Sequence, residues 1–125
     1  MSVMEIGQKL VAAVNSGRES EDAFVVDFYD ENITSIEGQG SEEMPQKMNG
    51  IGAVQGEHNW WYDNNEVHGS VATGPYCGHR DDQFVVRFNL DTTPVGGERG
   101  QMEEVAIFTV ANGKIVQEEF LYLMG

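Results

Sequence analysis

Arg87 lies inside the apolar stretch from Phe84 to Leu90, where a lone charge needs an explanation. A guanidinium in a strand either faces solvent, here beside Asn89, or points inward, where burial requires a carboxylate partner. Glu103 and Glu118 are the candidates for that partner. Three interpretations stay open: a buried structural ion pair, an exposed strand face, or an Arg87–Glu118 pair that acts on a substrate. The third is the catalytic hypothesis, with Asn89 and Glu103 as ligand contacts.

His58 and Glu37 are two further residues that suit proton transfer. His58 lies on the inward stripe of a predicted helix, and an ordinary imidazole exchanges protons near neutral pH. Glu37 is the last residue of a predicted strand, where desolvation by a cavity would raise its pKa and make it a general base. The alternatives are a core histidine that is hydrogen-bonded to the backbone and a carboxylate that faces solvent.

Several aromatic side chains are candidate ligand contacts, although rings of this kind more often fill a core. These candidates are Trp61, Tyr62, Phe120 and Tyr122. Trp60 lies off the inward stripe, and we expect it to meet a partner subunit.

The sequence has no histidine spacing typical of a metal site, no glycine-rich phosphate loop, no nucleophile elbow and no basic aromatic patch. We therefore expect no metal and no cofactor. Any catalysis would rest on acid/base chemistry by side chains alone.

Three helices must position these groups. Apolar residues at helical spacing predict the first helix over residues 1–16, and Ser20 is expected to cap a second helix. The third begins at Asn49 or Gly50. The buried stripe of the second is predicted to be Phe24, Val25, Phe28 and Tyr29, and that of the third Ile51, Val54, His58, Trp61 and Tyr62. A short strand over residues 33–37 and a loop over residues 41–50 lie between these two helices.

Four strands are predicted after the third helix, over residues 66–73, 83–91, 101–110 and 114–123. Asn112-Gly113 between the last two is the signature of a two-residue hairpin turn. That turn predicts Val110 opposite Ile115 and Ile107 opposite Glu118. Both faces of the hairpin are largely apolar, so the face that lines a cavity stays open.

Helices followed by a run of long strands indicate the α+β class, with helices on one side of a sheet that is mostly antiparallel. We expect residues 1–125 to form a single domain. A sheet of this size twists, and its glycines allow bends, so it is expected to curl into a half-open cone.

The chain has 21 acidic and seven basic residues, which gives a formal net charge of -14. Such a surface repels phosphate backbones and anionic lipids, so we expect neither nucleic acid nor a membrane as a partner. No apolar run approaches the roughly 20 residues that span a bilayer, and the amino terminus lacks a signal-peptide pattern. The single cysteine, Cys77, cannot form an internal disulfide. We expect a cytoplasmic protein.

The order of elements resembles the NTF2-like superfamily and, within it, the SnoaL-like proteins. The segments that carry this resemblance are Phe28–Ile33, Asp82–Phe88, Met102–Val105 and Asn112–Phe120. The resemblance covers essentially the whole chain. It implies a cone-shaped barrel with three N-terminal helices packed on a strongly curved sheet, a homodimer through the outer sheet face, and one apolar pocket for a small molecule.

The catalytic patterns known in this superfamily are incomplete here. Ketosteroid isomerases place an aspartate just after the first strand, where this chain has Glu37-Gly38 with the glycine at the base position. Epoxide hydrolases of the fold use Arg-X-Asp, but this chain has Asn89 two residues after Arg87, and Phe120 stands where the acid of the last strand would be. The superfamily also includes polyketide cyclases, dehydratases and non-catalytic binding modules, so the fold does not give the function.

Two functions are therefore expected as alternatives. The first is a pocket protein that binds a small apolar molecule and carries out acid/base catalysis of the isomerase, cyclase or hydrolase type. The second is a non-catalytic ligand-binding or dimerisation module in which the charges hold the cone together.

Overall fold

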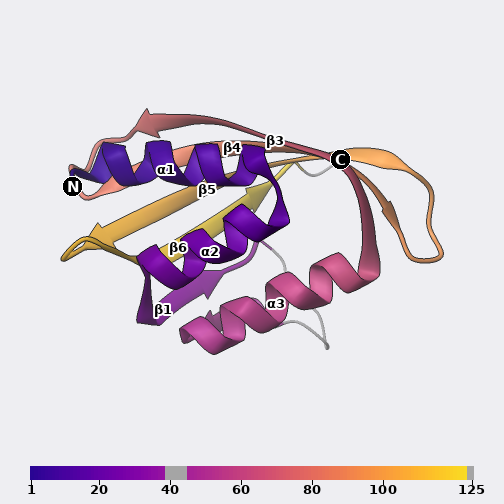
Figure 1. Cartoon of the computed structure of the whole chain (residues 1–125), viewed down its shortest axis with the longest axis horizontal. Helices are drawn as coiled ribbons and strands as arrows, with labels where there is room; N and C mark the ends of the chain where they lie inside the picture. Colours follow the sequence, from indigo (N-terminus) through magenta and orange to yellow (C-terminus); the bar gives the residue numbers. More distant parts are fainter. Residues whose placement is uncertain (39–44, 124–125) are drawn as a thin grey trace.

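The computed structural model describes residues 1–38 and 45–123 and consists of three helices and one sheet (Figure 1). The helices are α1 (Val3–Ser16), α2 (Arg18–Phe28) and α3 (Ile51–Asn64). The strands are β1 (Tyr29–Ile36), β2 (Lys47–Asn49), β3 (Asn65–Cys77), β4 (Gln83–Pro94), β5 (Gly100–Ala111) and β6 (Lys114–Tyr122).

The first two helices follow one another almost without a break. Ser2 and Glu5 form a capping box that starts α1. Gly17, at φ +117°, ends α1 and directly precedes α2. The predicted cap at Ser20 is therefore wrong, because α2 already begins at Arg18. Tyr29, predicted in the helical stripe, is instead the first residue of β1.

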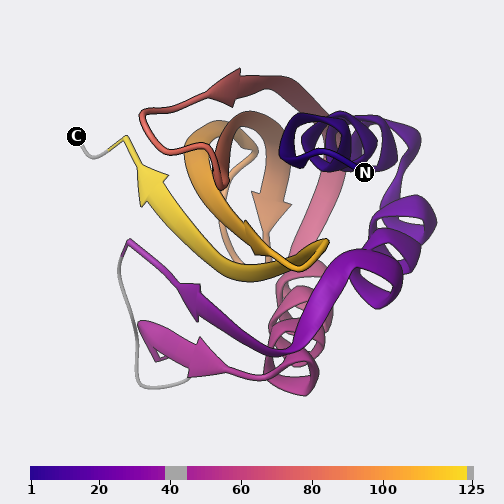
Figure 2. The same cartoon turned by 90° about the vertical axis from the view of Figure 1, so that its left-hand side faces the viewer.

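The six strands form one sheet in the order β2-β1-β6-β5-β4-β3, in which β1 and β6 run parallel and the other neighbours are antiparallel. The sheet is strongly curved, and the helices lie on its concave side (Figure 2). This arrangement confirms the predicted α+β class. β2 lies within the stretch predicted as a loop, residues 41–50, of which residues 41–44 fall outside the described residues.

The core fills the space between the concave face and the helices. Alternate residues of β4, from Phe84 to Leu90, are buried, and the Phe84 ring stacks on Phe108 of β5 with centroids 5.0 Å apart. Burial of each large apolar side chain is worth about 1.5–3 kcal/mol. α1 packs closely on this core through Gly7, where an added Cβ would lie 2.8 Å from the Cβ of Pro75.

The last hairpin has the predicted turn but a different register beyond it. Asn112 and Gly113 have φ angles of 53° and 76°, as a type I′ turn requires, and Val110 pairs with Ile115 as predicted. A bulge then inserts one residue into β6, so that Ile107 faces Glu119. The predicted pairing of Ile107 with Glu118 is therefore wrong.

The bulge decides which residues of β6 point into the cone. Ile115 and Glu118 are both buried although three positions separate them, which strict alternation would not allow. Glu118 lies opposite Phe108 and shares the concave face with it. The concave face of β5 and β6 thus carries Glu104, Ala106, Phe108, Ile115, Glu118, Phe120 and Tyr122.

None of the helices in the described ranges is long and apolar enough to cross a membrane.

Candidate functional site

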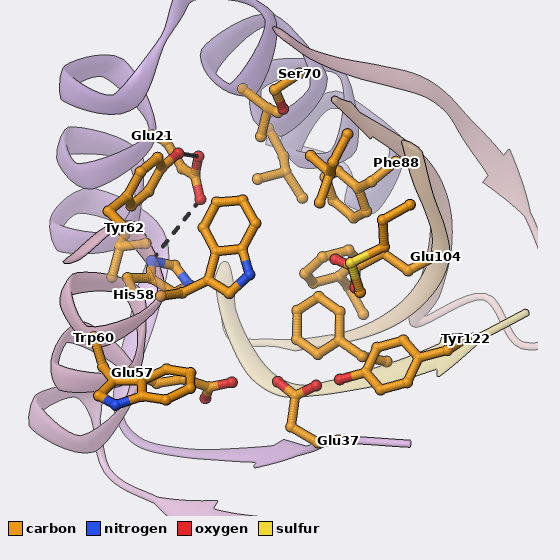
Figure 3. A pocket seen from close by; sticks show the side chains of 18 of the residues that line it. Glu21, Glu37, Glu57, His58, Trp60, Tyr62, Ser70, Phe88, Glu104 and Tyr122 are labelled. Atoms are coloured by element: carbon orange, nitrogen blue, oxygen red, sulfur yellow. Dashed lines mark hydrogen bonds and ion pairs between the residues drawn. The ribbon is translucent and has the colours of Figure 1, made fainter. Parts of the chain in front are cut away.

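A cavity of about 410 Å³ opens between α3 and the concave face of the sheet (Figure 3). Apolar and aromatic side chains make up most of its wall. Helix α3 contributes Glu57, His58, Trp60, Trp61 and Tyr62, and the facing strands contribute Phe88, Leu90, Met102, Glu104, Phe108, Phe120 and Tyr122. A concave, mostly apolar site with a few polar groups is the usual form of a small-molecule pocket.

Two carboxyl groups face one another on one side of this cavity. Figure 3 shows the side chain of Glu57, from α3, and that of Glu37, just after β1, pointing toward each other. Glu37 is fixed there by a backbone hydrogen bond from its N–H to the carbonyl of Gln46, at 2.8 Å. Burial, a hydrogen bond with Glu57 and repulsion from Glu57 raise the pKa of Glu37 to about 10. Glu37 therefore holds a proton at neutral pH.

A third carboxyl group, that of Glu104 on β5, enters the cavity from the sheet (Figure 3). Burial raises its pKa to about 7, with repulsion from Glu118 and Glu57 as smaller causes. A carboxyl group with this pKa is partly ionised near neutral pH. It can therefore accept a proton from a ligand where an ordinary glutamate would be too weak a base.

Glu118 lies beneath the cavity wall and is 1% exposed. The hydroxyl of Tyr29 donates a hydrogen bond to one of its carboxyl oxygens, and Ser35 Oγ donates to the other at 2.9 Å. Burial raises the pKa of Glu118, while His58 and these two hydrogen bonds act in the opposite direction. Burial, together with Glu118, also raises the pKa of Tyr29 well above its usual value, so this hydroxyl keeps its proton.

His58 belongs to a second polar group, at the end of the cavity near α2. Its Nδ1 lies 3.9 Å from Glu21 Oε1, and the hydroxyl of Tyr62 donates to Glu21 Oε2 at 3.1 Å (Figure 3). Arg18 stacks on the Tyr62 ring, with its guanidinium carbon 4.4 Å from the centroid. Burial is the main cause that raises the pKa of Tyr62, followed by its contact with Glu21.

The structure brings most of the predicted site residues to the cavity, but not all of them. The predicted residues that line it are Glu37, His58, Trp61, Tyr62, Phe120 and Tyr122. Arg87, Asn89 and Glu103 point to the other face of the sheet, and Glu118 lies below the wall. The hypothesis of an Arg87–Glu118 pair is therefore wrong, because the two side chains lie on opposite faces of the sheet.

Alternation along β4 explains the position of Arg87. Phe84, Val86, Phe88 and Leu90 are buried on the concave side, so the odd-numbered position between them must face outward. There Arg87 Nε lies 2.8 Å from Glu103 Oε1, and their side chains are 46% and 38% exposed. The pair is one of the exposed strand-face interactions that the sequence left open, and it adds little to stability.

Several cavity residues were not singled out from the sequence. Glu57, Glu104, Glu21 and Tyr29 were missing from the candidates, and Trp60 lines the cavity although it was expected to meet a partner subunit. Signals in the sequence could have found Glu57 and Glu104. Glu57 lies one turn from the buried Val54, and Glu104 shares its strand face with Ala106 and Phe108.

In the described part of the chain, no group of three or more His, Cys, Asp and Glu side chains is arranged to hold a metal ion.

Comparisons with known proteins agree on the family. The sequence profile of the SnoaL-like domain matches residues 1–122. A crystal structure from Mesorhizobium loti, of a protein provisionally named a SnoaL-like polyketide cyclase with carbohydrate phosphatase as a second name, is 33% identical. The alignment covers 98% of this chain and 100% of that one, with a TM-score of 0.87. A comparison with curated proteins gives no match.

Two more distant structures share the fold alone. A provisionally named SnoaL-like polyketide cyclase from Jannaschia sp. CCS1 is 13% identical, with a TM-score of 0.73 over 95% of this chain and 83% of that one. An NTF2-like protein of unknown function from Burkholderia pseudomallei is 14% identical, with a TM-score of 0.76 over 98% and 92%. The profile match over nearly the whole chain, together with the Mesorhizobium loti structure, shows that this chain belongs to the SnoaL-like domain family.

Proposed function

We propose that this protein binds a small, largely apolar molecule in the cavity and carries out acid/base chemistry on it without a cofactor. The single observation that supports this proposal most is the half-buried carboxyl pair of Glu37 and Glu57 (Figure 3). A carboxylic acid that stays protonated at neutral pH can donate a hydrogen bond to the oxygen of a bound carbonyl group. Such a donor stabilises the negative charge that develops on that oxygen.

Glu104 supplies the complementary group. Because its pKa is about 7, it is partly ionised near neutral pH and can remove a proton from the carbon next to the carbonyl group. The electron pair of that C–H bond moves toward the carbonyl oxygen, to which Glu37 would redirect the hydrogen bond that it otherwise makes with Glu57. Return of the proton at the same or another carbon completes an exchange or an isomerisation. In a cyclisation, the enolate carbon would attack a second carbonyl group of the same molecule, and the proton held by Glu104 would pass to the oxygen of that group.

The family supports this class of reaction. The Mesorhizobium loti relative is provisionally named a polyketide cyclase. Cyclisation of a polyketide requires a carbanion beside a carbonyl group, which is what the Glu37 and Glu104 arrangement would stabilise. A cavity of about 410 Å³ with aromatic walls suits an apolar carbonyl compound.

Proton exchange of a simple ketone tests the proposal. We expect the protein to accelerate the exchange of the methyl protons of 2-acetylnaphthalene in D₂O, measured by NMR. Glu37→Gln and Glu104→Gln should each lower the rate by roughly 100-fold, the usual size of one acid/base contribution. Glu119→Gln, on the outer face of β6, is the matched control and should exchange at the wild-type rate.

The fluorescence of the two tryptophans, Trp60 and Trp61, which both line the cavity, would report binding of the same ketone independently. Binding without any acceleration of exchange would contradict the catalytic proposal and favour the second candidate, a non-catalytic binding module. That alternative has its own support. Glu118 is fully hydrogen-bonded inside the protein by Tyr29 and Ser35, and Arg87 is paired outside the cavity, so both act as structural groups.

We also propose that two copies associate through the convex face of the sheet. Val85, Val105, Ile107 and Leu121 lie on this face beside the Arg87–Glu103 pair, and Leu121 is 52% exposed. An apolar patch with one charge of each sign can meet its own copy across a two-fold axis, where each Arg87 faces the partner's carboxylate.

A further inference from the structure

We propose that the cavity takes an apolar molecule that carries a positive charge, an organic amine or ammonium ion, and that it rejects organic carboxylates. This inference rests on the proposed function, because it names the class of ligand that the same cavity binds.

The charges that line the cavity are strongly unequal. Four carboxyl groups line it, one each from α2, α3, β5 and the residue after β1: Glu21, Glu57, Glu104 and Glu37. Among the described residues that line it, His58 is the one basic side chain, and neither lysine nor arginine contributes. A fifth carboxyl group, that of Glu118, lies directly below the wall. A ligand in the cavity is therefore surrounded on several sides by carboxyl groups, which are negatively charged when ionised.

The nearest arginine does not offset these charges from inside the cavity. Arg18 lies against the Tyr62 ring and lines a second, more open hollow of about 510 Å³. Its guanidinium donates to Asn59 Oδ1 at 3.1 Å and lies 3.9 Å from Asp22. The Arg18 guanidinium therefore interacts with Asn59 and Asp22 near the surface, and the Tyr62 ring lies between it and the cavity.

Aromatic side chains supply the second half of a cation site. Trp60, Trp61 and Tyr62 line the cavity from α3, and Tyr122 faces them from β6 (Figure 3). The rings of Trp61 and Tyr62 pack edge to face, at 82° with centroids 5.1 Å apart. The face of an aromatic ring attracts ammonium groups, and quaternary ammonium ligands are commonly held by such rings.

The protonation of the carboxyl groups agrees with this ligand class. Repulsion among Glu37, Glu57, Glu104 and Glu118 adds to burial in raising the pKa of Glu37 to about 10 and that of Glu104 to about 7. A bound cation favours the ionised carboxylates, so its arrival should release protons. A bound carboxylate would add a further negative charge to the same low-dielectric space, which disfavours binding.

Three probes that share a naphthalene ring test the charge preference by calorimetry at pH 7. These probes are 2-naphthylmethylamine, the neutral ketone 2-acetylnaphthalene and 2-naphthoate. We expect the amine to bind at least tenfold more tightly than the ketone, and the ketone at least tenfold more tightly than the carboxylate. Titration of the amine in two buffers of different ionisation enthalpy should show proton release, which the ketone should not.

One variant locates the effect in the cavity. Glu57→Gln should weaken binding of the amine by at least tenfold more than it changes binding of the ketone. Glu119→Gln removes a carboxylate from the outer face and should change neither, so it separates a local effect from that of net charge.

The outcomes distinguish this inference from the proposed function. Equal or tighter binding of the carboxylate than of the amine, while the ketone still binds and exchanges its protons, would overturn the inference alone. Failure of all three probes to bind would overturn both. Tight amine binding that Glu57→Gln leaves unchanged would also overturn the inference, because the cation would then bind elsewhere.

Discussion

At the scale of single residues, the burial of carboxyl groups separates two kinds of glutamate in this protein. Glu118 is 1% exposed and has two hydroxyl donors, from Tyr29 and Ser35, so its hydrogen-bonding capacity is met inside the protein. Glu37 and Glu104 instead point into a cavity, where a ligand can reach them. Glu118 is therefore suited to stabilise the fold, whereas Glu37 and Glu104 are suited to exchange protons with a ligand.

Stability as a function of pH gives a test of Glu104. Its pKa in the folded protein, about 7, is above the ordinary value of 4.5. The folded state therefore holds this proton more tightly, and the stabilising contribution, present below pH 4.5, is lost as pH rises through about 7. A rise of this size corresponds to a loss on the order of 3 kcal/mol.

We therefore expect the Tm of the wild type to fall relative to that of Glu104→Gln as pH rises from about 5 to about 8, measured by calorimetry. Glu119→Gln controls for the loss of a carboxyl group from the outer face. A difference in Tm between wild type and Glu104→Gln that stays the same at both ends of this pH range would contradict the assignment.

At the scale of elements, the packing of α1 on the sheet depends on the absence of one side chain. A Cβ at Gly7 would lie 2.8 Å from the Cβ of Pro75 and 3.0 Å from the ring of Phe84. Both neighbours belong to strands that the helix covers, so the helix would have to move outward. This contact also sets the position of Leu10 and Val14, which line the cavity from α1.

We expect Gly7→Ala to destabilise the protein by about 1–3 kcal/mol, the usual cost of overpacking, in urea denaturation. Gly52→Ala is the matched control, because Gly52 also lies in a helix but has nothing within 4 Å of an added Cβ. Because alanine has a better helix propensity than glycine, Gly52→Ala should stabilise the protein by up to about 1 kcal/mol. Equal effects of the two substitutions would show that α1 has room at Gly7.

Local signals predicted the elements well, whereas the bulge of β6 left no mark in the sequence. Asn112-Gly113 fixes the turn because both residues adopt positive φ, and Val110 and Ile115 pair as that turn requires. The extra residue beyond Ile115 has no glycine or proline to announce it. Because of this insertion, the sequence could not show that Ile115 and Glu118 point to the same side.

The prediction of the candidate site was incomplete, because spacing identifies apolar residues on an inward face more readily than charged ones. Aromatic residues on α3 and β6 were found because their spacing follows a helix face or a strand face. Glu57 and Glu104 lie on the same inward faces, but a carboxylate is usually exposed, so type and position gave opposite signals. Arg87 was given three possible positions, although the alternation of Phe84, Val86, Phe88 and Leu90 already favoured the face of β4 that points away from the core.

At the scale of the whole molecule, the proposed homodimer forms through the convex face of the sheet, and a substitution on this face tests it. Val105 lies at its centre, paired with Arg87 on one side and Leu121 on the other. We expect a dimer by light scattering at micromolar concentration. Val105→Lys should shift it to a monomer, because like charges would meet across the two-fold axis.

Val26→Lys is the control for this substitution, because Val26 is 63% exposed on α2. It should remain a dimer. A wild-type protein that is monomeric at this concentration, or a Val105→Lys variant that stays dimeric, would refute the proposed interface.

β6, the last strand of the sheet in chain order, takes one of the two central places in it. β6 lies between β1 and β5, and its parallel pairing with β1 joins residues that are more than 80 positions apart in the chain. Until β6 is synthesised, a nascent chain presents the unpaired edges of both neighbours, which is the kind of surface on which strands of other chains add. The sheet can therefore be completed only after β6 is synthesised, and such distant pairing is intrinsically slow.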